Sequence, residues 1–298
     1  MFARVGRSLI KAMRPKQWTK NALVMAGYVF ALGDKSQTID KSLFWEALGA
    51  TAAFCLTSSA VYLFNDVRDC EQDRQHPEKS KRPIAAGDLR KGTAVAWSVV
   101  FALLGMGGAV LLSPPFAEVL GLYLVLQLAY SLVLKSIELV DVFVIATGFV
   151  LRAIGGAVVI GIAFSPWLLL CTLLLALFLA LCKRRHEKVV LNHSANDSRP
   201  ALAGYDAKLL DQLIAIAGSA TLVCYSLYTL WPDTVEKFDT DLMAWTIPFV
   251  IFGIFRYLDL VYRHKKGDKP EQILLTDGPL MVDIALYGIA VLWILLGS

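Results

Sequence analysis

Apolar residues in this chain gather in nine long runs that are separated by shorter, charged segments. A helix that crosses the hydrocarbon core of a bilayer needs about 20 consecutive apolar residues. Since most of the runs approach this length, the pattern predicts an all-α integral membrane protein with nine transmembrane helices. The expected spans are Trp18–Leu32, Leu43–Phe64, Thr93–Leu112, Phe116–Leu134, Leu139–Ala163, Ser165–Cys182, Leu209–Trp231, Leu242–Tyr262 and Leu280–Leu296.

The beginning of the chain has a different pattern. Met1–Met13 alternates basic and apolar residues at helical spacing, which predicts an interfacial amphipathic helix whose cations face anionic lipid headgroups. A basic segment with Trp18 as an aromatic anchor follows it. We expect a single membrane domain over 1–298, in which 1–17 forms the interfacial helix and basic segment and 18–298 forms the nine-helix bundle.

Composition supports the membrane assignment. Of the 298 residues, 56% are apolar, whereas a soluble protein is about 45–50% apolar. The five cysteines form no CxxC pair, and four of them lie within apolar runs. The sequence therefore predicts neither a disulfide framework nor a zinc site.

Basic residues are distributed unevenly between the segments that join the spans. If the N-terminus is cytoplasmic, 25 of the 29 Lys and Arg residues fall in the inner segments, which are 1–20, 65–92, 135, 183–208 and 256–277. Cytoplasmic loops of membrane proteins carry such an excess of positive charge. The long charged segments should therefore all lie on the cytoplasmic side.

The interior of the predicted spans is almost free of ionisable residues. A transporter usually has polar residues near the bilayer midplane, but here Arg152 is nearly alone at that depth. The polar residues gather instead at the cytoplasmic mouth. This distribution favours an enzyme that works on one water-soluble and one lipid substrate.

An acidic cluster, N-D-V-R-D-C-E-Q-D at 65–73, follows the second predicted span. If the helix continues at about 100° per residue, one amide and three carboxylates share a face. Carboxylates at such spacing repel one another, and Mg2+ takes oxygen ligands that it often shares with substrate phosphates. We predict a magnesium site here, with a solvated acidic helix end as the alternative. The acidic face consists of Asn65, Asp66, Asp69 and Asp73.

The loop after the acidic face is rich in cations. Lys79, Lys81 and Arg82 can neutralise phosphate oxygens. Carboxylates followed by cations suit a diphosphate held between Mg2+ and basic side chains. The alternative is a loop whose positive charge only sets the orientation in the membrane.

Arg152 lies inside the fifth predicted span, where a buried arginine needs an anion. Asp141 opens the same span, but eleven residues of straight helix place it about 16 Å away. The partner of Arg152 is therefore either a carboxylate on another helix or a substrate phosphate.

At this point the chain resembles the UbiA superfamily of membrane prenyltransferases. The resemblance rests on N-D-x-x-D-x-x-x-D at 65–73, H-P-x-K-x-x-R-P-I-x-x-G at 76–87 and the nine spans. Within the superfamily the chain looks most like the decaprenyl-phosphate phosphoribosyltransferase branch. The residues that point there are R-P-K-Q-W-T-K-N at 14–21, Y-S-L-x-L-K at 130–135, V-D at 140–141, G-F-V-L-R-A-I at 148–154, K-R-R-x-E at 183–187 and R-Y-L at 256–258.

The chain departs from the wider superfamily after the sixth span. Members that use a prenyl diphosphate carry a second aspartate cluster in that loop, whereas this chain has K-R-R-H-E-K at 183–188. A basic loop argues against a second metal and for direct contact with phosphate. The departure disfavours the alternative function, an aromatic prenyltransferase that uses a prenyl diphosphate donor.

The resemblance implies transfer of 5-phosphoribose from phosphoribosyl diphosphate (PRPP) to a polyprenyl phosphate of the decaprenyl type. The products would be polyprenyl-phosphoryl-5-phosphoribose and diphosphate. The expected cofactor is Mg2+, and the expected partners are PRPP, the polyprenyl phosphate and the membrane, without nucleic acid. The implied location is a bacterial inner membrane with the active site and N-terminus cytoplasmic. A homo-oligomer is left open.

The resemblance also assigns roles to the residues. Asp66, Asp69 and Asp73 would be catalytic as ligands of Mg2+, with Asn65 as a further oxygen ligand. Lys79, Lys81 and Arg82 are candidates for the diphosphate or the ribose 5-phosphate of the donor. The candidates for the remaining phosphates are Lys16, Lys20, Tyr130, Lys135, Arg152, Lys183 and Arg184.

Overall fold

The computed structural model describes residues 2–34, 40, 42–75, 78–163, 165–191, 204–263, 273–274 and 276–297. Across these residues all regular secondary structure is helical, which confirms the predicted all-α class. His76 and Pro77 of the H-P-x-K motif lie outside the described residues.

Eight helical segments in the described part of the chain are long and apolar enough to cross a membrane. The chain is therefore an integral membrane protein that crosses the bilayer several times. The eight segments are α3 (Ser42–Arg68), α5 (Lys91–Leu112), α6 (Pro114–Leu132), α7 (Val140–Val159), α8 (Pro166–Leu191), α10 (Ala207–Leu230), the 3-10 helix η4 (Leu242–Thr246) with α12 (Ile247–Tyr262), and α14 (Gly278–Gly297).

The first predicted span has a different form from the others. Residues Pro15–Met25 form a 3-10 helix, η1, and the α-helix α2 that follows covers only Ala26–Leu32. Arg14 adopts a left-handed conformation before Pro15, and polar residues occupy much of η1, so the apolar stretch is short. The predicted count of nine is therefore approximate.

A close approach fixes η1 in the bundle. A Cβ atom added to Gly156 of α7 would lie 1.9 Å from the carbonyl oxygen of Val24. Only glycine allows the two backbones to lie so near each other. This contact holds η1 beside the C-terminal half of α7.

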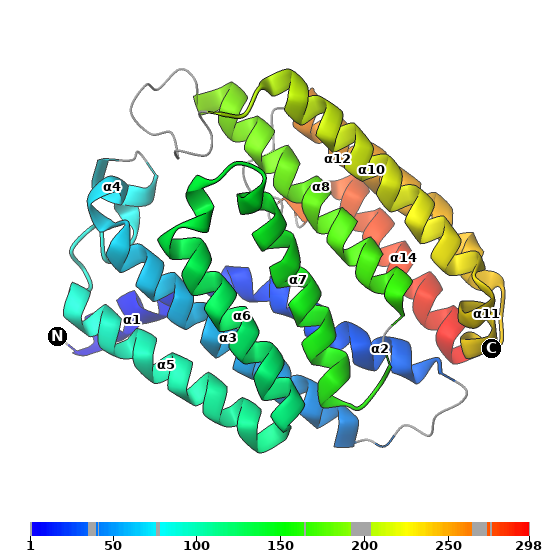
Figure 1. The fold of residues 1–298 in the computed structure, drawn as a ribbon, viewed down its shortest axis with the longest axis horizontal. Coiled ribbons are helices and arrows are strands. Elements are labelled where there is room, and N and C mark those ends of the chain that lie inside the picture. Colours follow the sequence, from blue (N-terminus) through cyan, green and yellow to red (C-terminus); the bar gives the residue numbers. More distant parts are fainter. Residues whose placement is uncertain are drawn as a thin grey trace.

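The helices form two groups on either side of α7 (Figure 1). On one side α7 packs against α6, and α3 packs along α5. On the other side α7 packs against α8, which lies along α10. The short helix α1 (Phe2–Met13) packs Val5, Leu9 and Met13 against the cluster formed by α3 and α5.

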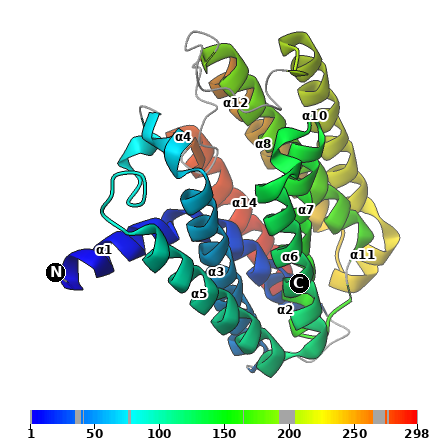
Figure 2. The same cartoon turned by 60° about the vertical axis from the view of Figure 1, so that its left-hand side comes forward.

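The two ends of the bundle carry different short helices (Figures 1 and 2). At one end α4 (Cys70–Gln75) follows α3, and at the opposite end α11 (Pro232–Phe238) follows α10. We call these the α4 end and the α11 end. The turn between α6 and α7 contains the 3-10 helix η3 (Leu134–Ser136) and lies at the α4 end.

The basic segment Lys183–Lys188 is helical. We predicted it as a loop after the sixth span, but α8 continues through it to Leu191. That part of the prediction was wrong because the charges are paired. Arg184 binds Asp141 of α7, and Arg185 binds Asp211 of α10, so both arginines lie along neighbouring helices and not in a loop.

Candidate active site

The acidic face lies at the α4 end, where α3 passes into α4. The amide of Asp69 donates to the carbonyl of Asn65 at 2.9 Å, and the amide of Asp73 donates to the carbonyl of Asp69 at 2.8 Å. These bonds carry the helical repeat through the short break between α3 and α4, as the spacing predicts. Asp66 and Asp73 are 2% and 4% exposed, while Asp69 is partly exposed.

Arg82 joins two of the carboxylates. Its Nη1 donates to Asp66 Oδ1 at 3.2 Å and to Asp73 Oδ2 at 2.6 Å. Arg82 follows η2 (Lys79–Lys81) in the cationic loop, so the loop folds back over the acidic face. The fold of the loop therefore brings a cation directly against two of the aspartates.

Two further cations come from distant parts of the chain. Arg14, directly before η1, pairs with Asp66. Lys135 of η3 donates through Nζ to both carboxylate oxygens of Asp69, at 2.7 and 2.8 Å. Each aspartate therefore has a basic partner, and the partners remain 23–28% exposed. Because these cations reach solvent, each of them can also donate hydrogen bonds to the oxygens of an anionic ligand.

Two oxygen atoms of the acidic face fit a metal ion. Asp66 Oδ2 and Asn65 Oδ1 are buried and accept no hydrogen bond within the described residues. Leaving such atoms unsatisfied costs about 1–3 kcal/mol each, and a hard cation such as Mg2+ prefers oxygen ligands. Among the same residues no three Asp, Glu, His or Cys side chains converge on one point. Asn65 and Asp66 are thus the best-placed ligands.

Arg152 occupies a separate position deeper in the bundle. Its Nε donates to Asn21 Oδ1 at 2.7 Å, Nη1 to the carbonyl of Gly148 at 2.7 Å and Nη2 to the hydroxyl of Tyr123 at 2.8 Å. The Tyr123 ring centroid lies 4.7 Å from the guanidinium carbon. All three of these partners are neutral, so the first alternative, a carboxylate on another helix, is not found within the described residues.

Arg184 is enclosed by protein groups. It is 2% exposed, donates through Nε to Asp141 Oδ2 at 2.6 Å and pairs with Glu187 through Nη1. We predicted that it contacts a substrate phosphate. The geometry instead places its charge against two carboxylates of the protein, so a substrate would have to displace them.

The other predicted phosphate-binding residues lie on segments near the acidic face or on α6 and α8. Lys16 and Lys81 are exposed, whereas Lys20, Lys79, Tyr130 and Lys183 are partly buried. No contact in the structure tests their phosphate roles, which stay predictions.

Sequence reasoning missed three side chains that organise these groups. The basic charge of Arg14 indicates either orientation in the membrane or phosphate binding, yet in the structure the residue meets Asp66. Asn21 and Tyr123 hold Arg152. The proline after Arg14 was a usable signal for the turn, but nothing in the sequence pairs Asn21 or Tyr123 with a residue more than 25 positions away.

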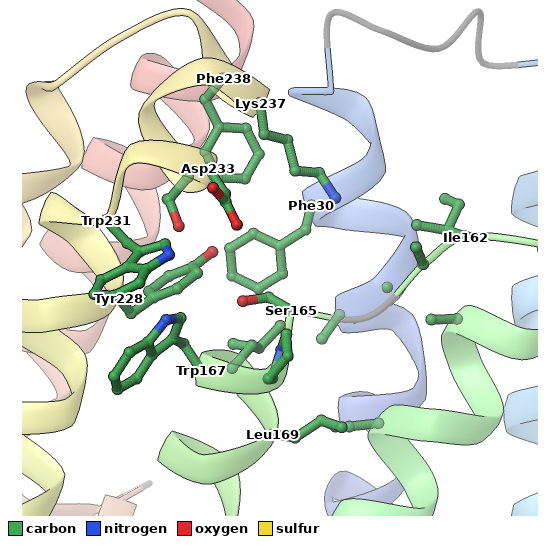
Figure 3. Close-up of a pocket in the computed structure, with 18 residues that line it drawn as sticks. Phe30, Ile162, Ser165, Trp167, Leu169, Tyr228, Trp231, Asp233, Lys237 and Phe238 are labelled. Carbon is green, nitrogen blue, oxygen red and sulfur yellow. The ribbon is translucent and has the colours of Figure 1, made fainter.

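A cavity of about 340 Å³ lies at the α11 end, away from the acidic face. Figure 3 shows aromatic side chains from several elements around it, and Asp233 and Lys237 also line it. Lys237 also pairs with Asp34 at 3.3 Å, which ties α11 to the end of α2. The cavity lining is mostly apolar. The acidic face and its cations lie at the other end of the bundle, the α4 end.

Comparison with known proteins agrees with the geometry. The model of the UbiA prenyltransferase family matches residues 22–275. Decaprenyl-phosphate phosphoribosyltransferase of Corynebacterium glutamicum is 35% identical over 280 residues, covering 92% of this chain and 82% of the relative. The enzyme of the same name from Mycobacterium tuberculosis is 36% identical over 283 residues, covering 95% and 92%.

The fold is similar to that of a solved UbiA homologue from Archaeoglobus fulgidus bound to GPP and Mg2+. The TM-score is 0.73 with 17% sequence identity, and the match covers 98% of this chain and 100% of that chain. At this sequence identity the similarity shows that the fold is shared and indicates nothing about the substrates.

Proposed function

The chain belongs to the UbiA prenyltransferase family, and on this premise we propose that it transfers 5-phosphoribose from PRPP to a polyprenyl phosphate of the decaprenyl type. The products are polyprenyl-phosphoryl-5-phosphoribose and diphosphate. Two relatives named for a decaprenyl-phosphate phosphoribosyltransferase activity, each at least 35% identical, support this choice of substrates.

The observation that carries the proposal is the pairing of one acidic face with three partly exposed cations. Arg14, Arg82 and Lys135 hold the carboxylates in the structure, and the same cations can turn to the phosphate oxygens of an entering substrate. In the described part of α8, Lys183–Lys188 offers no second aspartate cluster for a prenyl diphosphate. This combination suits two phosphorylated substrates better than a prenyl diphosphate and a neutral acceptor.

The reaction needs little from the protein in proton transfer. A phosphate oxygen of the lipid attacks C1 of the ribose, and the bond from C1 to the diphosphate oxygen breaks, so the electron pair leaves with diphosphate. The nucleophile is already an anion at neutral pH, and no general base is required. Positioning and neutralisation of charge then carry the catalysis.

The residues divide naturally into two roles. Asn65 and Asp66, with Asp69 and Asp73 nearby, would hold Mg2+, which supplies positive charge for the leaving diphosphate. Arg82 and the loop lysines would orient the donor, because their loop covers the acidic face.

Arg152 is the candidate for a phosphate of either substrate. Its charge is buried among neutral groups, and a buried cation without a carboxylate attracts an anion strongly. We further propose that the α4 end faces the cytoplasm of a bacterial cell, where PRPP is available, with the polyprenyl tail against apolar helix faces in the bilayer.

The test is a transfer assay with purified protein in detergent, Mg2+, radiolabelled PRPP and a polyprenyl monophosphate, followed by extraction into organic solvent. We expect label in the lipid phase and its loss on addition of EDTA. If folded protein transfers no label, the proposal fails. Repeating the assay with a prenyl diphosphate and an aromatic acid then tests the aromatic prenyltransferase.

A further inference from the structure

A second charged cluster at the α4 end belongs to none of the roles above. Asp141, at the start of α7, is 0% exposed. Its Oδ2 accepts from Arg184 Nε at 2.6 Å, and its Oδ1 accepts from the hydroxyl of Tyr205 at 2.7 Å. Arg184 also pairs with Glu187. We call Asp141, Arg184, Glu187 and Tyr205 the Asp141 network.

Tyr205 links this network to the turn between α6 and α7. Its hydroxyl donates to Asp141 and accepts the backbone N–H of Leu139 at 2.7 Å. Burial raises the pKa of this hydroxyl, so it remains a donor at neutral pH. One buried side chain therefore bonds both the first turn of α7 and the residue that precedes the helix.

Leu139 itself has an unusual backbone conformation, with φ 60° and ψ −41°. Residues other than glycine rarely adopt positive φ, and such strain, of order 1–3 kcal/mol, persists only where surrounding contacts hold it. The bond from Leu139 N–H to Tyr205 is such a contact. The strained residue ends the turn that begins with η3.

The same turn carries Lys135. Just before the turn, at the last residue of α6, Arg68 of α3 donates through Nη2 to the carbonyl of Leu132 at 2.7 Å. At its end, Tyr205 holds Leu139. Between these two anchors, Lys135 reaches both carboxylate oxygens of Asp69. The position of the Lys135 ammonium therefore depends on Tyr205 and Asp141, which do not touch the acidic face themselves.

We propose that Asp141, Tyr205 and Arg184 are positioning residues, which hold the Lys135 turn so that its ammonium meets Asp69 and an anionic substrate. This inference rests on the proposed function for its kinetic part. It replaces direct phosphate binding as the role of Arg184. It also gives the segment before α10 a function in assembling the site, since Tyr205 lies two residues before that helix.

The central variant is Tyr205→Phe, which removes both hydrogen bonds and keeps the ring. Tyr262→Phe is the matched control, because the Tyr262 hydroxyl also donates to a carboxylate, Asp211, at 2.7 Å but touches no part of the turn. Hydrogen exchange of the peptide covering 134–141 should become faster in Tyr205→Phe and stay unchanged in Tyr262→Phe. Unchanged exchange in Tyr205→Phe would overturn the network.

The kinetic test is a double-mutant cycle with Lys135→Met. We expect Tyr205→Phe alone to lower kcat/KM about 10–100-fold, as for other residues that orient a functional group. In the Lys135→Met background it should cause no further loss, because there is no ammonium left to position. A purely structural role would give the same loss in both backgrounds, and that result would overturn the positioning role.

The two readouts separate this inference from the function on which it rests. If the wild-type protein transfers no phosphoribose, the proposed function fails. The exchange comparison still decides whether Tyr205 holds the turn, because it requires no substrate.

Discussion

The acidic face and the Asp141 network contain similar groups at the same end of the bundle, yet they differ in how completely those groups are satisfied. Asp141 uses both carboxylate oxygens, and the side chains of the pair with Arg184 are 0% and 2% exposed. In the acidic face, Asp66 Oδ2 and Asn65 Oδ1 have no donor within the described residues, and the cations are 23–28% exposed.

This difference distinguishes the Asp141 network, a buried ion pair, from the acidic face, a candidate ligand-binding site. A buried pair with all its hydrogen bonds made has nothing to offer a substrate. Buried oxygens without donors, next to cations that reach solvent, can accept a metal ion and release their cations to phosphates. The predictions below test the contrast, from the largest effect to the smallest.

The largest effect should come from the acidic face. Asp66→Asn and Asp73→Asn should each reduce phosphoribosyl transfer by about 10²–10³-fold or more, because they remove carboxylates that would hold the Mg2+ acting on the leaving diphosphate. Glu71→Gln is the control, since Glu71 lies in the same stretch but points to Arg74 and Lys91. The label-transfer assay measures all three, and near-normal turnover in both aspartate variants would refute the metal assignment.

Metal binding should also be visible without turnover. Mg2+ at 100 times its Kd should stabilise the folded protein by about 2.7 kcal/mol, because it binds only the folded site. The unfolding temperature in detergent should therefore rise with Mg2+ in the wild type and not in Asp66→Asn. Equal shifts in both proteins would place the metal elsewhere.

Breaking the ion pair inside the Asp141 network should also lower stability. Arg184→Met leaves Asp141 buried with one partner fewer and should destabilise the protein by about 3–5 kcal/mol. Arg82→Met also leaves the buried carboxylates of Asp66 and Asp73 with one partner fewer, so it should lower stability as well, and in addition it should lower transfer activity because Arg82 would orient the donor. Chemical unfolding in detergent, measured beside transfer activity, compares the two variants. A stable Arg184→Met protein would show that the pair is dispensable.

The smallest effect concerns Glu71, whose side chain is 67% exposed. A hydrogen bond from Lys91 at 2.8 Å lowers the pKa of Glu71 below its ordinary value. A lowered carboxyl pKa stabilises the fold above the unfolded-state value of about 4.3, and this contribution is lost as pH falls through the folded-state pKa. The unfolding temperatures of wild type and Glu71→Gln should differ slightly at pH 7 and converge in acid. If the difference between the two unfolding temperatures grew as the pH fell, the pKa of Glu71 would not be lowered in the folded protein.

The part of the site that was predictable lies close together in the sequence. The spacing of Asp66, Asp69 and Asp73 gives one helical face, and Arg82 follows within a short loop. In the structure Arg82 bonds two of these aspartates, while its phosphate-binding role stays a prediction. Helical geometry links residues three or four positions apart, so a local pattern is enough to place them.

The unpredictable part depends on packing between distant helices. Arg184 looked like a phosphate ligand because its neighbours are basic, but Asp141, 43 positions earlier, neutralises it. Arg152 was expected to meet an anion, yet Asn21 and Tyr123 receive its hydrogen bonds. Charge in a sequence indicates that a partner is needed, and it does not indicate which partner.

The sequence by itself determined the membrane class, the helical fold and the acidic face, because hydropathy and helical spacing are local properties. The tertiary structure decided that η1 lies against Gly156 and that Lys135 meets Asp69. It also decided that Tyr205 bonds the end of the turn between α6 and α7. Each of these contacts joins segments that come together only when the helices pack. The physical reason is that a side chain's partner is set by which helices become neighbours.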